Sequence, residues 1–350
     1  MRSITVLSGG HGGAKFIEGL LHGLRAGVLP GISSAESDAG ADGAGAPEGV
    51  TVTVVANTAD DLWIHGLKVC PDLDTVMYTL GRGLDHDRGW GRTDETWSVK
   101  EDLEAYGAPN TWFGLGDRDI ATHLVRTQML EAGFTLSQVT EALCRRWLSP
   151  VYGDQVRLVP MSDDRIETHV AVKDDSSPSG LATVHFQEYW VRLRAAVPAE
   201  QLVFVGLESA TPAPGVIEAI AGADLVILPP SNPVVSVGTI LGVPGVRDAL
   251  AATAAPVVGI SPIIGGHHVR GMAEQMLASI GVDASAGAVG QHYGARSAGG
   301  IIDGWLVDSV DAASVTALED AGLRAAAVPL WMTDADATAA IAAAAIGLVR

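Results

Sequence analysis

The chain has 350 residues, with 41 acidic and 22 basic side chains and a formal net charge of -19. Nucleic acids and anionic membranes bind clustered Lys and Arg, so this charge balance argues against both as partners. The hydrophobic fraction of 47% suffices for one large core or two coupled domains. An anionic substrate would have to be held by backbone amides, a metal ion or a few placed cations.

The two cysteines, Cys70 and Cys144, stand far apart and do not form the pattern of a disulfide framework. The first residues have no signal-peptide pattern, and the Ala-rich stretch at 339–349 is too short to span a bilayer. These features predict a cytoplasmic protein with no membrane segment.

A glycine-rich turn follows the first predicted strand, residues 3–7, and precedes a predicted helix over residues 15–25. Four glycines in this turn would let backbone amides approach a phosphate at the start of the helix. The run lacks the Walker spacing, so an ordinary tight turn is the alternative, and Lys15 is either a phosphate cation or a solvated lysine. The candidate ligand-binding residues here are Gly9, Gly10, His11, Gly12, Gly13 and Lys15.

Residues 27–49 are mostly Gly, Ala, Ser, Pro and acidic residues, a composition typical of a mobile surface loop. The second strand, over residues 50–56, ends in Asn57 and Thr58, which are candidates to contact a ligand. Four carboxylates lie close behind in the chain: Asp60, Asp61, Asp72 and Asp74. Helix capping explains some of them. Crowded carboxylates repel one another, however, and Mg²⁺ bound together with substrate phosphates would relieve that repulsion.

Residues 72–150 lose the strand-like runs and are rich in helical patterns, which predicts a helical insertion. Five of the eight tryptophans lie in or beside it, and Trp63 and Trp90 are candidates for the wall of a flat-ring site, with ordinary core packing as the alternative. Arg118, at the start of one of these helices, is either a clamp for a phosphate or carboxylate or a surface ion-pair partner.

After residue 150 strands and helices alternate again, with strands expected over 156–160, 167–172, 182–191, 201–205, 225–228, 256–260, 304–307 and 324–328. The strands expected over 167–172 and 182–191 could form a hairpin that projects from the main sheet. The alternation predicts a Rossmann-like, doubly wound and mostly parallel α/β sheet, formed by residues 1–71 and 151–350, with the helical insertion at 72–150. Ligands bind at the carboxyl ends of such strands, where Ser231 and Asn232 also lie.

The motifs at these strand ends resemble those of the 2-phospho-L-lactate transferase family, called CofD in archaea and FbiA in actinobacteria. The matching segments run in family order: residues 8–10, 57–63, 71–76, 115–123, 161–164, 231–233 and 261–265. The departures are the 27–49 segment and His11, where relatives often carry Thr.

The resemblance implies a dimeric, Mg²⁺-dependent transferase of coenzyme F-420 biosynthesis that moves a substituted phosphate group. The donor would be a three-carbon acid linked to guanosine diphosphate, carrying a phosphoenolpyruvyl or 2-phospholactyl group, and the acceptor the deazaflavin Fo. The products would be GMP and (dehydro) coenzyme F-420-0; the actinobacterial type would use the phosphoenolpyruvyl donor. On this basis Asp61 and Asp74 are expected to coordinate Mg²⁺ and to act with Arg118 in catalysis.

A non-catalytic function is the alternative. A neighbouring family with a similar fold and glycine-rich start binds nucleotide-sugars and acts in regulation. Asp74 and residues 116–123 favour the transferase.

Overall fold

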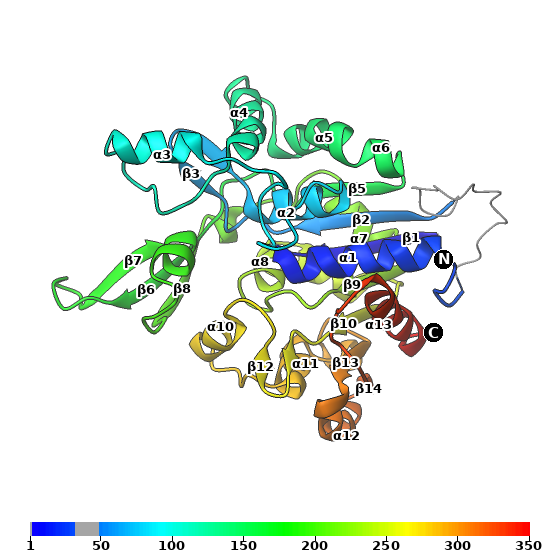
Figure 1. Cartoon of the computed structure of the whole chain (residues 1–350). Helices are drawn as coiled ribbons and strands as arrows, with labels where there is room; N and C mark the ends of the chain where they lie inside the picture. Colours follow the sequence, from blue (N-terminus) through cyan, green and yellow to red (C-terminus); the bar gives the residue numbers. More distant parts are fainter. Residues whose placement is uncertain (1, 32–48) are drawn as a thin grey trace.

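A fully parallel seven-stranded sheet forms the centre of the computed structural model, which describes residues 2–31 and 49–350 (Figure 1). Its order is β14-β13-β10-β9-β1-β2-β5. The strands are β1 (Ser3–Ser8), β2 (Thr51–Ala56), β5 (Val156–Pro160), β9 (Leu225–Leu228), β10 (Val257–Ile260), β13 (Gly304–Asp308) and β14 (Arg324–Val328). The predicted fold class is confirmed. Most of the segment predicted as a mobile loop, residues 32–48, lies outside the described residues.

The direction of winding reverses between β1 and β9. From β1 the chain proceeds outward through β2 to β5, and it then returns to add β9 on the opposite side of β1. From β9 it proceeds outward through β10, β13 and β14. The carboxyl ends of β1 and β9 therefore flank the topological switch point, where ligands bind in open parallel sheets.

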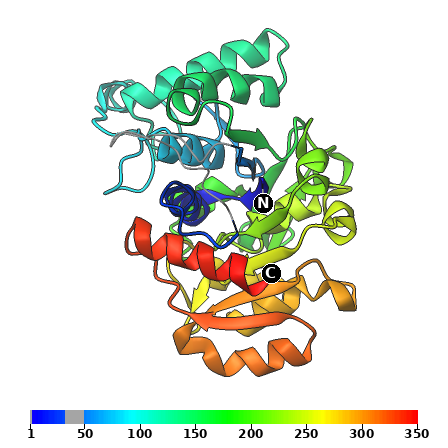
Figure 2. The same cartoon turned by 90° about the vertical axis from the view of Figure 1, so that its right-hand side faces the viewer.

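Helices cover both faces of the sheet because successive strand residues alternate between the faces. Val54 packs in the core under α1 (Gly10–Arg25), α2 (Pro71–Leu80) and α13 (Ala335–Leu348). Its neighbour Val55 belongs to the core on the other face. The helices that pack there are α7 (Val216–Ala221), α8 (Val237–Gly242), α9 (Val246–Ala252), α10 (Ala273–Ser279), α11 (Ala286–Tyr293) and α12 (Val315–Asp320). Figure 2 shows α13 lying alongside α1.

A helical insertion precedes β5 and forms the upper part of Figure 1. It begins after a hairpin of β3 (Leu62–Ile64) and β4 (Leu67–Val69). Its helices beyond α2 are α3 (Ser98–Ala105), α4 (Asp117–Glu131), α5 (Leu136–Trp147) and α6 (Ser149–Tyr152). A capping box of Thr135 and Gln138 starts α5, satisfying backbone donors that the helix leaves free. No helix among the described residues is both long and apolar enough to cross a bilayer.

A separate antiparallel sheet, β7-β6-β8, projects from the body at the left of Figure 1. It contains β6 (Glu167–Lys173), β7 (Leu181–His185) and β8 (Gln201–Val205). The sequence prediction was wrong here in two respects. The strand expected over 182–191 ends at His185 and a π-helix follows at Glu188–Arg192. Residues 201–205 pair with β6, not with the main sheet, because periodicity identifies a strand without naming its partner.

The remaining elements are short. A two-stranded ribbon of β11 (Ile263–Ile264) and β12 (His267–His268) follows β10. Short 3-10 turns occur at Leu207–Ser209, Arg296–Ala298 and Ser309–Ser314. The ribbon matters for the site because the loop after it borders the cleft at the switch point.

Candidate active site

A cleft of about 1550 Å³ opens at the carboxyl ends of β1, β2 and β9, and it extends between the main sheet, the insertion and the β6–β8 sheet. Pockets for one small molecule typically measure about 300–1,000 Å³. This cleft is therefore large enough to hold two substrates together.

The start of α1 faces the cleft, and the backbone amide of Gly10 there is hydrogen-bonded to the carboxylate of Asp72. Gly9 is the extended N-cap and has no side chain to cap the helix, and the first turn of α1 itself has no acidic residue. Gly9, Gly10 and Gly12 line the cleft. Such a helix start attracts anions. The helix begins at Gly10, several residues before the start predicted from its apolar pattern, because glycines add nothing to that pattern.

Three of the four glycines serve close packing, and a Cβ on Gly9 would lie 2.6 Å from Cβ of Ser236. A Cβ on Gly12 would lie 2.6 Å from the Pro230 carbonyl oxygen. A Cβ on Gly13 would lie 2.0 Å from Oγ of Ser8, and Gly13 does not line the cleft. The loop after β9 thus presses directly on the first turn of α1.

Ser231 and Asn232 line the cleft on that loop. The Ser231 hydroxyl donates to the Gly9 carbonyl at 2.7 Å and accepts from the Gly9 amide at 3.3 Å. The Asn232 side-chain oxygen accepts from the amides of Val234 and Val235, which fixes the turn. Both residues were predicted to contact the ligand, and both lie beside the start of α1.

Asp60 and Asp72 form a buried carboxylate pair at the cleft wall. Both accept from the same Asn57 amide nitrogen, at 3.2 and 3.0 Å, and the Asn57 oxygen accepts from Thr239. Burial, and for Asp60 the charge of Asp72, raises the pKa of both carboxyls, that of Asp72 to about 6. Asn57 therefore shapes the carboxylate pair and does not itself line the cleft.

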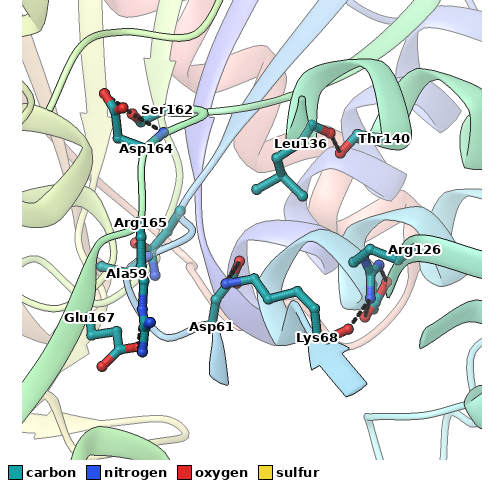
Figure 3. Close-up of polar contacts among 12 residues, drawn as sticks. Ala59, Asp61, Lys68, Arg126, Leu136, Thr140, Ser162, Asp164, Arg165 and Glu167 are labelled. Atoms are coloured by element: carbon teal, nitrogen blue, oxygen red, sulfur yellow. Dashed lines mark hydrogen bonds and ion pairs between the residues drawn. The ribbon is translucent and has the colours of Figure 1, made fainter. Parts of the chain in front are cut away.

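Asp61 does not occupy the place predicted for it. Its side chain is only 1% exposed and forms an ion pair with Lys68 of β4, at 3.2 Å (Figure 3). The Lys68 carbonyl in turn accepts from Arg126 at 3.3 Å. Asp61 is not among the cleft-lining residues, whereas its neighbour Asp60 is. Thr58 is buried as well and does not line the cleft.

Asp74 lines the cleft but is held by a buried arginine that the sequence reasoning missed. Both oxygens of Asp74 accept from the guanidinium of Arg126 on α4. Burial is the largest single effect and works against the charge on Arg126, but the charge and hydrogen bonds of Asp74, together with nearby Cys70 and Tyr78, outweigh it and raise the pKa of Arg126. Arg126 also donates to Nδ1 of His123, whose Nε2 is buried near Asp119. The network makes Asp74 an anchor between α2 and α4.

Arg118 lies outside the cleft, contrary to the prediction. Its side chain is half exposed, near Asp94 and the Thr93 carbonyl. The start of α4 is instead closed by Glu95, whose carboxylate accepts from the amides of Arg118 and Asp119. The arginine of α4 that contacts Asp74 is Arg126, about two turns further along the helix. It lies on the same face of α4 as Asp119 and His123, because residues on one face of a helix recur every three or four positions.

Aromatic side chains line the opposite wall of the cleft. Trp90 and Trp97 pack edge to face, with ring centroids 6.0 Å apart, as do Trp112 and Phe113 at 5.8 Å. Trp90 was predicted to line a flat-ring site, and it does line the cleft. Trp63 was predicted as well, but it is exposed on β3 outside the cleft. Trp190, in the π-helix between β7 and β8, also lines the cleft.

His11 and Lys15 both line the cleft from α1. Burial, followed by the nearby charges of Arg270 and Lys15, lowers the pKa of His11 to about 4. His11 is therefore neutral at physiological pH. Its Nδ1 is buried and has no hydrogen-bond partner among the described residues.

The carboxylates at the cleft wall are the side chains that could hold a magnesium ion. Within residues 2–31 and 49–350, no cluster of three or more His, Cys, Asp or Glu residues could hold a metal ion. Asp60 and Asp72 nonetheless provide two carboxylates in the cleft, and Oδ1 of Asp60 is buried with no hydrogen-bond partner within the described ranges, although the Thr168 side chain lies close enough to Asp60 to lower its pKa. Mg²⁺ is commonly held by one or two carboxylates together with substrate phosphates and water. The pair fits such a shared site.

Sequence reasoning missed Asp60 and Asp72 as the cleft pair, although it had placed both in the acidic cluster. It also missed Arg126, Arg270, Trp97 and Trp112. The tryptophan concentration was a usable signal for the last two. No local signal identified Arg126, since only the packing of α4 brings it to Asp74.

Comparison with known proteins places these features in a family. The model of the 2-phospho-L-lactate transferase CofD family matches residues 4–342. A protein of Streptomyces griseus named phosphoenolpyruvate transferase is 56% identical over 347 residues, covering 99% of this chain and 98% of that protein. Proteins of the same name from Thermobifida fusca and Mycobacterium sp. strain JLS are 54% and 53% identical over 345 residues, covering 99% of this chain and 97% and 98% of theirs.

Among solved structures, a protein from Bacillus halodurans has a similar fold. The TM-score is 0.58 at 16% sequence identity, covering 99% of both chains. A second structure of that protein, described as a member of the UPF0052 family, gives a TM-score of 0.57. At this identity the likeness concerns the fold alone. The match across nearly the whole sequence, and the cleft that joins its motifs, establish that the chain belongs to the 2-phospho-L-lactate transferase CofD family.

Proposed function

We propose that this protein transfers a phosphoenolpyruvyl group from a guanosine diphosphate-linked donor to the deazaflavin Fo, forming dehydro coenzyme F-420-0 and releasing GMP. One observation carries the proposal: a single cleft joins a helix start, a carboxylate pair and an aromatic wall. These suit a diphosphate, a divalent cation and a flat ring, respectively. The names of the relatives support the phosphoenolpyruvyl donor over the phospholactyl one.

The donor diphosphate is assigned to the start of α1. The Gly10 amide is hydrogen-bonded to Asp72, the amides of the next residues in the first turn are assigned to the diphosphate, and Ser231 holds Gly9 in place. Asn232 lies beside them. This arrangement binds negative charge without surface lysines, which suits an otherwise acidic protein.

Asp60 and Asp72 are the residues that would hold Mg²⁺. The bound ion would neutralise charge on the transferred phosphate group. Asn57 holds the two carboxylates in position through one shared hydrogen-bond donor. This assignment replaces Asp61, which is paired with Lys68, and leaves Asp74 as an anchor of Arg126.

The acceptor ring is assigned to the wall of Trp90, Trp97 and Trp112. The terminal ribityl hydroxyl of Fo then attacks the phosphorus that carries the three-carbon acid. A new phosphorus–oxygen bond forms, the bond to the bridging oxygen breaks, and GMP leaves. Such transfers depend on positioning and charge neutralisation more than on covalent help from the protein.

The test is incubation of the protein with Fo, Mg²⁺ and either donor, followed by mass analysis of the products. The proposal expects dehydro coenzyme F-420-0 and GMP from the phosphoenolpyruvyl donor. Omission of Mg²⁺ should abolish product formation. Binding of a nucleotide-sugar without any binding of Fo would contradict the proposal and favour a regulatory protein.

A further inference from the structure

Four cationic side chains line the cleft: Lys15, Lys100, Arg194 and Arg270. They are conspicuous because the protein has a net charge of -19. Lys100 has a partner, the carboxylate of Glu104 one turn along α3. In the described part of the chain, Lys15 and Arg270 have no carboxylate within ion-pair distance.

Arg270 joins the two sides of the cleft mouth. It lies in the loop between β12 and α10, and its guanidinium donates to the Arg88 carbonyl of the insertion at 2.6 Å. A Cβ on Gly89, which has φ 72, would lie 2.2 Å from Nη1 of Arg270. The guanidinium is thus packed against the Gly89 backbone.

Within hydrogen-bond and ion-pair distance, the described residues of the insertion offer Arg270 a carbonyl and no carboxylate. Arg88 lies over the rings of Trp90 and Trp97, at 5.6 and 5.3 Å, and pairs with Asp85 at 2.9 Å. The Asp85 carboxylate is therefore already engaged. The positive charge of Arg270 stays uncompensated by the protein residues described.

Lys15 and Arg270 both face His11, on the first turn of α1. The charges of both contribute to the lowered pKa of His11, after burial. His86 adds a smaller effect of the same sign. Two permanent cations and two histidines thus share one region beside the helix start, and an anion would be stabilised there.

We propose that Arg270 and Lys15 bind the carboxylate of the three-carbon acid carried by the donor. The inference rests on the proposed function. With the diphosphate at the amides of α1 and the Asp60–Asp72 pair, the acid carboxylate is the remaining negative group of the donor. The planar guanidinium of Arg270 suits a carboxylate because it can donate two parallel hydrogen bonds.

The test compares Arg270→Gln and Lys15→Gln with wild type, using Lys100→Gln as the control from the same cleft. Two quantities are measured: the KM for the phosphoenolpyruvyl donor, and the Kd of GDP, which lacks the acid. The expected result for Arg270→Gln is a KM raised about tenfold or more, with kcat changed much less and the Kd of GDP unchanged. Lys15→Gln should act in the same direction more weakly, and Lys100→Gln should resemble wild type.

A donor analogue with its carboxylate blocked as a methyl ester provides the second arm. Wild type should bind the ester about tenfold more weakly than the free acid, while Arg270→Gln should show a much smaller preference for the acid because only Lys15 then contacts the carboxylate. Arg270→Lys keeps the positive charge but loses the two parallel donors of the guanidinium. Its preference for the free acid over the ester should therefore lie between those of wild type and Arg270→Gln. Thermal melting of each variant checks that the fold is retained.

Three outcomes would overturn the inference: an unchanged donor KM in Arg270→Gln, a GDP affinity that falls as much as the donor affinity, or an ester bound as well as the acid by wild type. An equal loss of GDP and donor affinity would assign Arg270 to the diphosphate instead. All three outcomes are interpreted only if the wild-type protein forms product. Absence of product from wild type with either donor would instead contradict the proposed function.

Discussion

Asp60 and Asp72 are two carboxylates whose ionisation the fold opposes. A carboxyl with a raised pKa in the native state binds its proton more tightly there than in the unfolded chain. Its contribution to stability is present below the unfolded value of 3.8 and is lost as the pH rises through about 6 for Asp72. At neutral pH without metal the pair therefore destabilises the protein, and a bound cation would reverse this effect.

Asp72→Asn should raise the free energy of unfolding at pH 7.5 without metal, by about 1–3 kcal/mol, because it removes a buried charge and keeps the acceptor for Asn57. At pH 4 the gain should largely vanish. Adding Mg²⁺ and GDP should stabilise wild type and not the variant. Urea unfolding measures all three effects, with Asp87→Asn, an exposed carboxyl of the same cleft, as the control. A variant that gains stability from Mg²⁺ as wild type does would remove Asp72 from the metal site.

The buried pair of Asp74 and Arg126 makes a different prediction. Removal of either partner leaves an uncompensated buried charge, so Asp74→Leu and Arg126→Met should each cost about 3–5 kcal/mol. The double variant Asp74→Leu/Arg126→Met should recover most of that stability. A double-mutant cycle by urea unfolding measures the coupling.

The same double variant separates stability from chemistry. If Asp74 also takes part in transfer, as the sequence predicts, the restabilised double variant should still form no product. Turnover at the wild-type rate would limit Asp74 to its structural role.

At the scale of elements, the first turn of α1 is held against the loop after β9 by glycines without side chains. Gly13 faces Oγ of both Ser8 and Ser231, at 2.0 and 2.5 Å from where a Cβ would lie. This close approach brings the amides of α1 and Ser231 to one place. Helix start and loop therefore form the anion site together.

Gly13→Ala should destabilise the protein by about 1–3 kcal/mol, because the methyl group would force the loop away from the helix. Gly347→Ala is the matched control, since Gly347 lies in the helix α13 with no atom within 4 Å of a Cβ. That substitution should stabilise by up to about 1 kcal/mol. The comparison is made by urea unfolding, together with GDP affinity, which should fall only for Gly13→Ala. Equal stability of the two variants would contradict the packing argument.

At the scale of the whole molecule, the cleft is assembled from three parts that are far apart in the chain. The topological switch point of the sheet supplies polar groups, and the insertion supplies Trp97 and Trp112. The segment that forms the β7-β6-β8 sheet supplies Trp190. The last part also touches the carboxylate loop, where the Thr168 amide donates to the Ala59 carbonyl at 2.7 Å. Two substrates can meet only where these parts converge.

Replacement of Trp97 or Trp112 by Leu should weaken Fo binding about tenfold, since each ring offers a stacking surface. GDP affinity should stay unchanged. Trp63→Leu is the control, because Trp63 is exposed outside the cleft. Quenching of Fo fluorescence measures the binding. A loss in Trp63→Leu that matches the loss in Trp97→Leu would place the ring site elsewhere.

Most of the strands and helices, and the place of the motifs at the carboxyl ends of the strands, could be predicted from local patterns in the sequence. Buried strands such as β9 are continuous apolar runs, and α4 and α5 have apolar residues at helical spacing. These patterns depend on neighbours along the chain, so they can be read without coordinates. The parallel order of the strands brings Gly10 and Asp74 to the same cleft, but Asp61, which was predicted to lie there with them, does not line it.

Which acidic residues line the cleft and which form buried ion pairs depends on tertiary packing and could not be predicted from the sequence. Asp60 and Asp61 are adjacent in sequence, but one lines the cleft and the other is paired with Lys68. The partner of Asp74 comes from 52 residues away, on a helix whose packing angle no local pattern encodes. A carboxylate's chemistry depends on the charges within a few ångströms of it, and in this protein those charges come from distant segments.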